Sequence, residues 1–276
     1  MRRASDFPMH RRLRGVTLVE MIVVIVVSGI LLSIVGMFTR NQIGSYIDVA
    51  NRTELADTAD TALRRMAREI RGALPNSVRV SAAGNILEFV PIRDAGRYRA
   101  QKGSAGGNEL DFSAGGDTFD VLGPPVQVAA GDQLVIYNLG IQGADVYGGT
   151  SLRSLKSTGA ALSSLEFTGA PFQFASPYNR FQIVGGPVSY VCDVANQTLW
   201  RYSGYAFQPA QPTTLANLDA LVGVTRARLA LDVSACNLSY VAGVLQRNGL
   251  VSMRLTLTRN GESVELLHQV DVMNSP

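Results

Sequence analysis

An uncharged apolar run near the N-terminus constrains the fold of this chain more than any other feature. Residues 21–38, MIVVIVVSGILLSIVGMF, contain no charged side chain. A helix needs about 20 mainly apolar residues to cross the hydrocarbon core of a bilayer. The run therefore predicts one membrane-spanning helix, with its spanning part at about residues 16–38.

Positive charge is concentrated immediately before this run. Arginines occupy positions 2, 3, 11, 12 and 14, and Asp6 is the single acid among them. The whole chain has a formal net charge of +3, so the residues after position 15 carry no excess of positive charge. Because positive residues that flank a span stay on the cytoplasmic side, the rest of the chain is expected across the membrane. A body of this charge does not favour nucleic-acid binding.

After the apolar run, the pattern changes to that of an amphipathic helix. Apolar residues recur at steps of three and four, which is the spacing of one helix face. They are Leu55, Ala59, Ala62, Leu63, Met66, Ile70 and Leu74. No proline lies between Met9 and Pro75, so one helix is expected over residues 16–74. We expect the stripe to pack on the protein's own sheet, and Gly36 and the pair at 44–45 are positions where the helix can bend.

The same kind of pattern predicts a β-rich domain over residues 75–276. Short runs with alternating apolar residues are bounded by Gly, Pro or Asn, which is typical of antiparallel strands. The runs include SVRVS, ILEFVPI, QLVIY, FQIV, VSYVC, TLWRY, ARLALDV, LVSMRLTLT and SVELLHQVDV. Asn-Gly within RNGE, residues 259–262, predicts a hairpin between the last two runs. The predicted fold class is α+β, a long helix packed on a globular domain.

The two cysteines, Cys192 and Cys236, lie far apart in the strand-rich region. Neither belongs to a C-x-x-C pair or lies near a histidine, so a zinc site is not expected. In a body outside the cytoplasm they can form a disulfide worth about 4 kcal/mol in the chain-entropy model. The alternative is a pair of unpaired buried thiols.

The sequence provides few candidates for catalysis, and neither an enzyme, a cofactor nor a metal is expected. The only histidines are His10, in the basic leader, and His268, in a predicted strand, so a nucleophilic site depends on His268 alone. Trp200 is expected to pack in the core or on a sheet face. The glycine-rich stretch 101–117 predicts a solvated loop, since the spacing of Asn108, Asp111 and Asp117 differs from that of a calcium-binding EF-hand loop.

The basic leader ending in Gly15, the residues VTLVE at 16–20 and the apolar run resemble the N-terminus of the type IV pilin and pseudopilin superfamily. The resemblance implies that a prepilin peptidase removes residues 1–15 by cutting after Gly15. Val16 then becomes the N-methylated terminus, where the superfamily usually has phenylalanine.

Glu20 matches the acidic fifth residue of the mature chain in the same superfamily. In an assembled bundle it is expected to pair with the amine of a neighbouring subunit and so fix the axial register. The alternative is an acid that lies at the membrane interface and is stabilised only by the helix dipole.

Three further segments, residues 54–80, 188–202 and 249–276, are similar to minor pilin-like proteins of mannose-sensitive haemagglutinin (MSHA) pilus biogenesis. This similarity implies a Gram-negative inner-membrane protein with a periplasmic body that later joins the pilus on the cell surface, at or near the tip. The implied partners are the prepilin peptidase and other major and minor pilins. Alternatives are a type II secretion pseudopilin of the larger tip-subunit kind and an uncleaved membrane-anchored periplasmic binding module. A periplasmic enzyme is the weakest alternative.

Overall fold

A computed structural model describes residues 15–104, 106–243 and 247–274, and the chain divides into two compact units, residues 1–50 and 51–276. The helix α1 (Leu18–Arg71) has 54 residues and runs from the first unit into the second. It is shorter than the predicted 16–74. It ends at Arg71 because Ala73 and Leu74 instead pair with residues 90–91. Gly36 and Gly44 do not interrupt it.

Within the described residues, the remaining regular structure is a short helix, α2 (Leu215–Asp219), and sixteen strands. The strands are β1 (Arg79–Val80), β2 (Ile86–Phe89), β3 (Ile92–Tyr98), β4 (Thr118–Leu122), β5 (Val126–Val128), β6 (Gln133–Val135), β7 (Leu152–Leu155), β8 (Gly159–Leu162), β9 (Ser164–Thr168), β10 (Arg180–Val184), β11 (Val188–Asp193), β12 (Thr198–Ser203), β13 (Thr225–Leu231), β14 (Val233–Val241), β15 (Gly249–Arg259) and β16 (Glu262–Val272). Their pairings within the described residues are antiparallel. The α+β prediction is confirmed.

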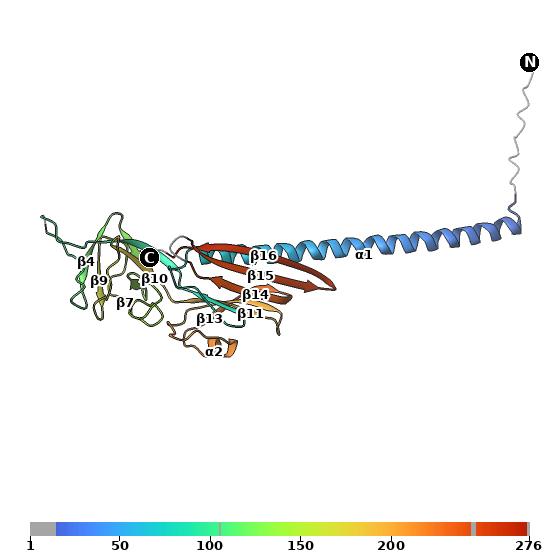
Figure 1. The fold of residues 1–276 in the computed structure, drawn as a ribbon. Helices are drawn as coiled ribbons and strands as arrows, with labels where there is room; N and C mark the ends of the chain where they lie inside the picture. The colour runs from blue at the N-terminus through green and yellow to red at the C-terminus, as the bar shows by residue number, and fades with distance from the viewer. Residues whose placement is uncertain (1–14, 105, 244–246, 275–276) are drawn as a thin grey trace, which may run out of the picture. The chain divides into compact units, whose positions relative to one another are not determined.

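Two sheets pack on the second half of α1. One has the strand order β1-β2-β11-β12-β13, and the other has the order β14-β15-β16 (Figure 1). The apolar stripe predicted from the sequence is buried against them, as Ala59 and Ile70 show with 0% exposure. This core also includes Tyr190 from the first sheet and Met253 from the second. The expectation that the stripe packs on the protein's own sheet is confirmed.

The last two strands form the hairpin that RNGE predicts. Arg259 and Glu262 are paired across the turn. Asn260 and Gly261 have φ angles of 54° and 87°, the left-handed conformation that a two-residue hairpin turn of this kind requires.

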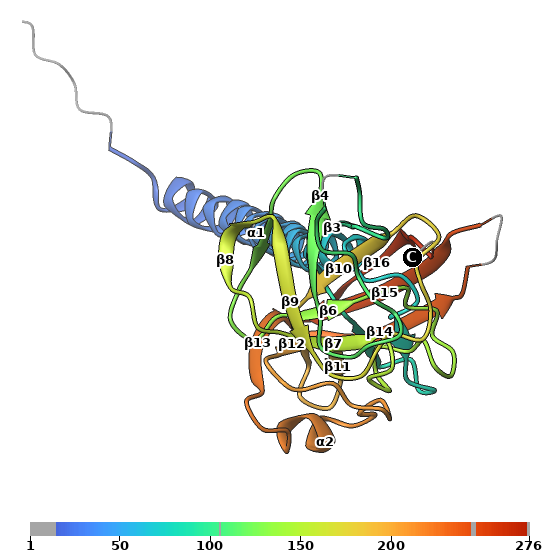
Figure 2. The same cartoon turned by 90° about the vertical axis from the view of Figure 1, so that its left-hand side faces the viewer.

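A closed barrel is inserted between two neighbouring strands of the five-stranded sheet. β2 pairs directly with β11, and the chain between them forms a six-stranded barrel in the order β10-β3-β4-β9-β7-β6 (Figure 2). The predicted run ILEFVPI therefore divides into two strands of different sheets. Pro91 lies at the division, where its missing N–H removes a ladder hydrogen bond.

Aromatic rings fill the barrel interior. The ring of Phe119 packs edge-on against Phe181 with 5.5 Å between the centroids, and it also contacts Tyr98 and Phe167. β3 passes close to this cluster at Gly96, where an added Cβ would lie 2.7 Å from the Phe181 ring. In Figure 1 the barrel strands β4, β7 and β9 lie at one end of the second unit, and β14, β15 and β16 lie along α1 at the other.

Candidate functional site

The predicted cleavage position lies just before the helix. Residues 15–17 are not helical, and Val16 is 63% exposed. A Cβ added at Gly15 would meet no atom within 4 Å, and Gly15 does not have a positive φ angle. The described fold therefore gives no steric or backbone reason for a glycine at this position. Recognition of this sequence by another protein, such as a protease, would be a reason for a glycine here that does not depend on the fold.

Thr17 and Glu20 form the start of α1. The backbone N–H of Glu20 donates to the Thr17 hydroxyl at 3.3 Å, and the N–H of Met21 donates to the Thr17 carbonyl at 3.1 Å. Thr17 is thus the N-cap, and a carboxylate three residues later is favoured by the spacing of a capping box and by the helix dipole. This local role supports the alternative explanation of Glu20.

The Glu20 side chain is exposed, and it forms no ion pair within residues 15–104, 106–243 and 247–274. Val16 is four positions before it, which is about one helical turn. Cleavage after Gly15 would place a new amine at this end of the helix. The site can therefore provide one acid and one amine close together on every processed copy.

The helix that follows the site has the length and composition of a membrane span. The most apolar 18-residue window within Leu18–Thr39 has a mean hydropathy of 2.8, and none of it is buried. Ser33 and Thr39 donate their hydroxyl protons to the carbonyls four residues earlier, which satisfies these polar groups within the helix. The apolar surface of this segment needs an environment other than water.

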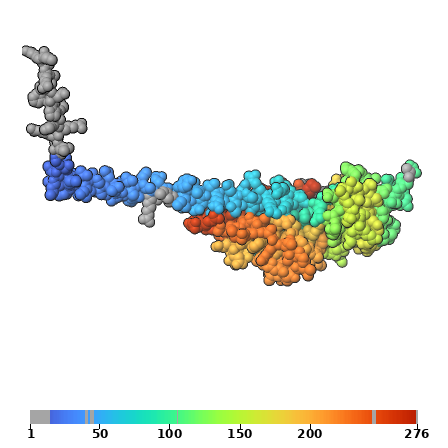
Figure 3. Space-filling view, turned by 180° about the vertical axis from the view of Figure 1, so that it is seen from behind, coloured from blue at the N-terminus to red at the C-terminus, as the bar shows by residue number. Residues whose placement is uncertain are grey.

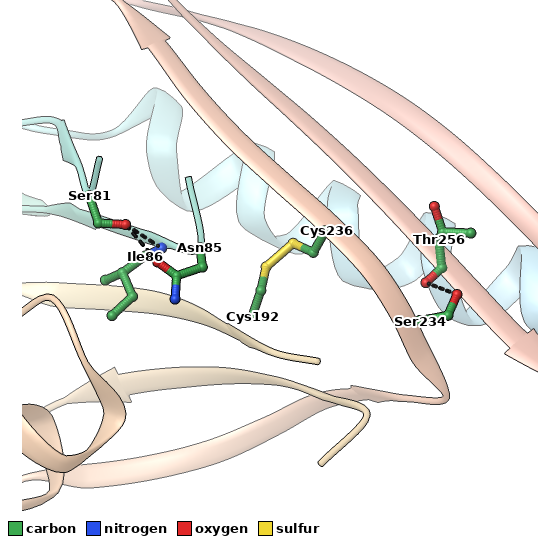
Figure 4. Close-up of a disulfide and its surroundings, with 7 residues drawn as sticks. All are labelled: Ser81, Asn85, Ile86, Cys192, Ser234, Cys236 and Thr256. Carbon is green, nitrogen blue, oxygen red and sulfur yellow. Dashed lines mark hydrogen bonds between the residues drawn. A yellow bond between two sulfur atoms is a disulfide. The ribbon is translucent and has the colours of Figure 1, made fainter. Parts of the chain in front are cut away.

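Cys192 and Cys236 form a disulfide (Figure 4). Their Cα atoms are 6.1 Å apart, and Cys192 lies on β11 while Cys236 lies on β14. The bond thus joins the two sheets that hold the second half of α1. Ser81 and Asn85, which are hydrogen-bonded to each other at 2.8 Å, lie beside it in Figure 4.

A buried polar cluster around Glu88 was not predicted from the sequence. The Nε of Arg79 lies 2.6 Å from the fully buried Glu88 carboxylate, and the Tyr205 hydroxyl donates to the same carboxylate at 3.0 Å. Burial raises the pKa of Glu88 above its usual value, whereas Arg79 acts in the opposite direction. Arg79 also stacks over the Tyr147 ring, whose hydroxyl donates to the Ser77 carbonyl.

This cluster has a structural role. Glu88 and Arg79 are paired across the β1–β2 hairpin, whereas Tyr147 comes from the chain that follows β6. The cluster therefore connects the barrel to the five-stranded sheet. The hairpin register could have indicated it, because an acid and a base directly opposite each other stabilise a strand pair.

The candidates for catalysis are not brought together. His268 is half-buried in β16 opposite Met253, and His10 is outside the described residues. Trp200 is partly buried and packs against a hydrophobic cluster that includes Leu218 of α2. The Arg226 guanidinium lies 4.9 Å from the centre of its ring. Within the described parts of the chain, no group of three or more His, Cys, Asp or Glu side chains is placed to hold a metal ion.

The loop at 101–117 uses its carboxylates locally. Asp111 accepts from the backbone and hydroxyl of Ser113 at 2.7 and 2.6 Å, and Asp117 accepts from the backbone N–H of Asp111 at 2.9 Å. The hydrogen bonds from Ser113 lower the pKa of Asp111. These contacts stabilise turns, as expected for a solvated loop.

A shallow hollow of about 460 Å³ lies where β7 meets the chain after β9. Arg153 lines it, and the guanidinium donates to backbone carbonyls, including those of Ala170 and Pro171. Burial lowers the pKa of Arg153. The arginine holds two segments together, and its guanidinium is already engaged by these carbonyls.

Comparison with known proteins identifies one feature. Residues 10–36 match the family model described as the prokaryotic N-terminal methylation motif. No curated protein and no solved structure matches the chain. The chain thus carries a type IV pilin-like prepilin signal, which supports processing by prepilin peptidase and pilin partners. The motif and the apolar helix together indicate a membrane-anchored, pilin-like or pseudopilin-like protein.

Proposed function

We propose that this chain is a minor pilin-like structural subunit for assembly of an MSHA-type type IV pilus, similar to the biogenesis protein MshO. The match of residues 10–36 to the N-terminal methylation motif is the observation that carries the pilin role. The similarity of the three later segments to MshO supports the narrower assignment. The subunit acts by packing rather than by catalysis, and it has a place at or near the filament tip.

The proposed route begins in the inner membrane with the body in the periplasm. Prepilin peptidase cuts between Gly15 and Val16, and the Val16 amine is methylated. Apolar residues of Leu18–Thr39 first contact lipid and then, in the pilus, the helices of other pilins. Glu20 pairs with the amine of a neighbouring subunit and thereby fixes the axial register.

The deciding experiment is the intact mass and N-terminal sequence of the protein from membranes of cells with and without prepilin peptidase. We expect a chain that begins at methylated Val16 only where the peptidase is present. Gly15→Leu is a clean variant, because the structure has open space around Gly15. It should keep residues 1–15 and fold normally. A leader that remains in both strains would instead indicate an uncleaved anchor.

A second test addresses Glu20. Glu20→Ala and the isosteric Glu20→Gln should leave the body folded but lower the amount of protein recovered in sheared pili, since both remove the charge that an amine can approach. Asp48→Asn, a change of another exposed acid on the same helix, is the matched control. Normal recovery of Glu20→Gln would remove the role in axial register.

Deletion of the gene distinguishes a role in a pilus from a role in type II secretion. Deletion of this subunit should reduce surface pili and leave type II secretion of exoproteins unchanged. The reverse result would support a pseudopilin.

A further inference from the structure

The outward face of α1 between residues 54 and 71 carries a separated pattern of charge. The opposite face is buried against the two sheets, and this one lies at the molecular surface (Figure 3). We call six of its residues the outward stripe. They are three acids, Glu54, Asp57 and Asp60, followed by three arginines, Arg65, Arg68 and Arg71.

The acids and arginines of the outward stripe have the same internal spacing. Glu54 is eleven positions before Arg65, Asp57 is eleven before Arg68, and Asp60 is eleven before Arg71. Eleven residues are about three helical turns, so the members of each pair point in nearly the same direction. The distance along the axis between them is about 16 Å.

Three of the four flanking members of the outward stripe have partners in their own chain, and the fourth, Arg71, forms no ion pair with another described residue. Glu54 pairs with Arg259 at 2.9 Å, Asp60 with Arg64 at 2.6 Å and Arg65 with Glu69 at 3.3 Å. Even so, the Glu54 side chain remains 63% exposed.

Two members at the centre of the face have no such partner among the residues that the structure describes. Asp57 and Arg68 are exposed, and neither forms an ion pair with another described residue. Their charges are available to a molecule that approaches the helix from outside.

We infer that the outward stripe is the contact surface for a second copy of this chain, parallel to the first and offset along the helix axis by about 16 Å. At this offset Asp57 of one copy faces Arg68 of the other, and Glu54 and Asp60 lie level along the axis with Arg65 and Arg71 of the other copy. Two copies in register place like charges opposite each other, which is unfavourable. The pattern therefore selects the offset arrangement.

The anchor determines the direction of the two helices. In every copy the acidic end of the outward stripe is the end that continues in sequence toward the apolar segment. Copies that leave one membrane in the same direction and run parallel through this segment present the stripe in the same direction. Copies at equal depth repel through this face, and the contact becomes favourable when one is displaced relative to the other.

This inference rests on the proposed function, since a filament supplies the axial displacement. It also places at least two copies next to each other. The Glu20 contact involves a different neighbour, because a helical bundle gives each subunit neighbours at more than one axial offset.

Cross-linking of the full-length protein in sheared filaments tests the geometry. The native cysteines are joined in the disulfide, so a maleimide linker reacts with introduced thiols. Two differently tagged copies, one with Asp57→Cys and one with Arg68→Cys, should form a mixed dimer. Either variant alone should not. Dimers formed between two Asp57→Cys copies would show that the copies are in register and would overturn the inference.

A second pair of variants distinguishes parallel from antiparallel helices. The parallel offset predicts that Glu54→Cys links to Arg65→Cys. An antiparallel pair would instead link Glu54→Cys to Arg71→Cys, and that product would overturn the inference. So would the absence of any dimer between copies, or a link to a different pilin only.

Charge reversal tests the energetics. Asp57→Arg should lower the amount in filaments by about threefold, given the usual strength of exposed ion pairs, and Arg68→Asp should do the same. The double variant Asp57→Arg/Arg68→Asp should restore the level. Unchanged levels in the single variants contradict the inference.

The N-terminal mass of each sample separates the two proposals. Loss of processing at Gly15 in all samples would contradict the proposed function. Normal processing with the wrong cross-link would contradict only the offset contact.

Discussion

Residues 18–39 and 51–71 belong to one helix, yet their apolar side chains have opposite environments. In the first segment every residue is exposed, including Leu31 at 57%. In the second segment apolar residues at steps of three and four are buried, and Leu63 is 2% exposed. The first segment has a uniform apolar surface that suits lipid or other helices, whereas the second has one apolar face that its own sheets cover. The chain itself therefore covers the apolar surface in one half of this helix, whereas in the other half other molecules must cover it.

The largest expected effect comes from loosening the structure around the second segment. Cys192→Ala/Cys236→Ala should lower the free energy of unfolding of the body by about 4 kcal/mol, since the bridge closes a separation of 44 residues. Urea unfolding of the full-length protein in detergent, followed by the fluorescence of the single Trp200, measures it. Reduced wild-type protein is the control and should match the variant. An unchanged midpoint would show that packing alone holds the two sheets together.

The same substitution in the two segments tests the comparison directly. Leu63→Ala should destabilise the body by about 3 kcal/mol because it leaves a cavity in the core. Leu31→Ala should leave the unfolding midpoint of the body unchanged, since its side chain is exposed. Both are read by Trp200 fluorescence in the same detergent. Equal effects of the two changes would refute the division of the helix into two environments.

A smaller, pH-dependent effect is expected at Glu69, which lies on the second segment. Its carboxylate is 2.8 Å from the Nε of Arg201 on β12. Burial is the largest single influence and would raise the pKa of Glu69, but the hydrogen bond and positive charge of Arg201 and further hydrogen bonding, including that of Arg65, together outweigh it and lower the pKa below its ordinary value of 4.5. The carboxylate thus stabilises the fold above pH 4.5, and this contribution is lost as the pH falls through the lowered pKa.

Glu69→Gln should therefore cost about 1 kcal/mol at neutral pH, and the difference from wild type should shrink in acid. Urea unfolding at several pH values checks it. Asp60→Asn removes a more exposed ion pair and serves as the control, with a loss of at most about 0.5 kcal/mol. A constant difference from pH 7 to pH 3 would argue against the Arg201 contact.

The sequence predicts well where a single local pattern decides the structure. The apolar run, the helical stripe and the Asn260–Gly261 turn each depend on neighbouring residues, and the structure contains all three. The N-terminal methylation motif at residues 10–36 is likewise contiguous and could be recognised from the sequence, whereas cleavage after Gly15 stays a prediction. The predicted disulfide between Cys192 and Cys236 is confirmed. The sequence keeps unpaired thiols as an alternative, because the bond depends on two strands of different sheets meeting.

The barrel shows where prediction from sequence stops. Its closure depends on β6 pairing with β10 and β3 pairing with β4, which are contacts between distant segments. Strands such as β8 (Gly159–Leu162) are short and lack the alternation that indicates a strand. Pro91 indicates an interruption of the run ILEFVPI, but it does not show that the strands on its two sides join different sheets.

The insertion of the barrel also bears on how such a protein can change. Phe89 and Val188 are paired across β2 and β11, so the chain leaves the five-stranded sheet and returns to it at adjacent positions. A segment with adjacent ends can be lengthened, shortened or exchanged without moving the strands on either side. The part of the body that packs on α1 and the barrel can therefore evolve at different rates. An engineer could replace residues 92–184 with another domain whose termini are close together and keep the helix and its two sheets, if the new domain also replaces the contacts of Tyr147 with Arg79 and Ser77.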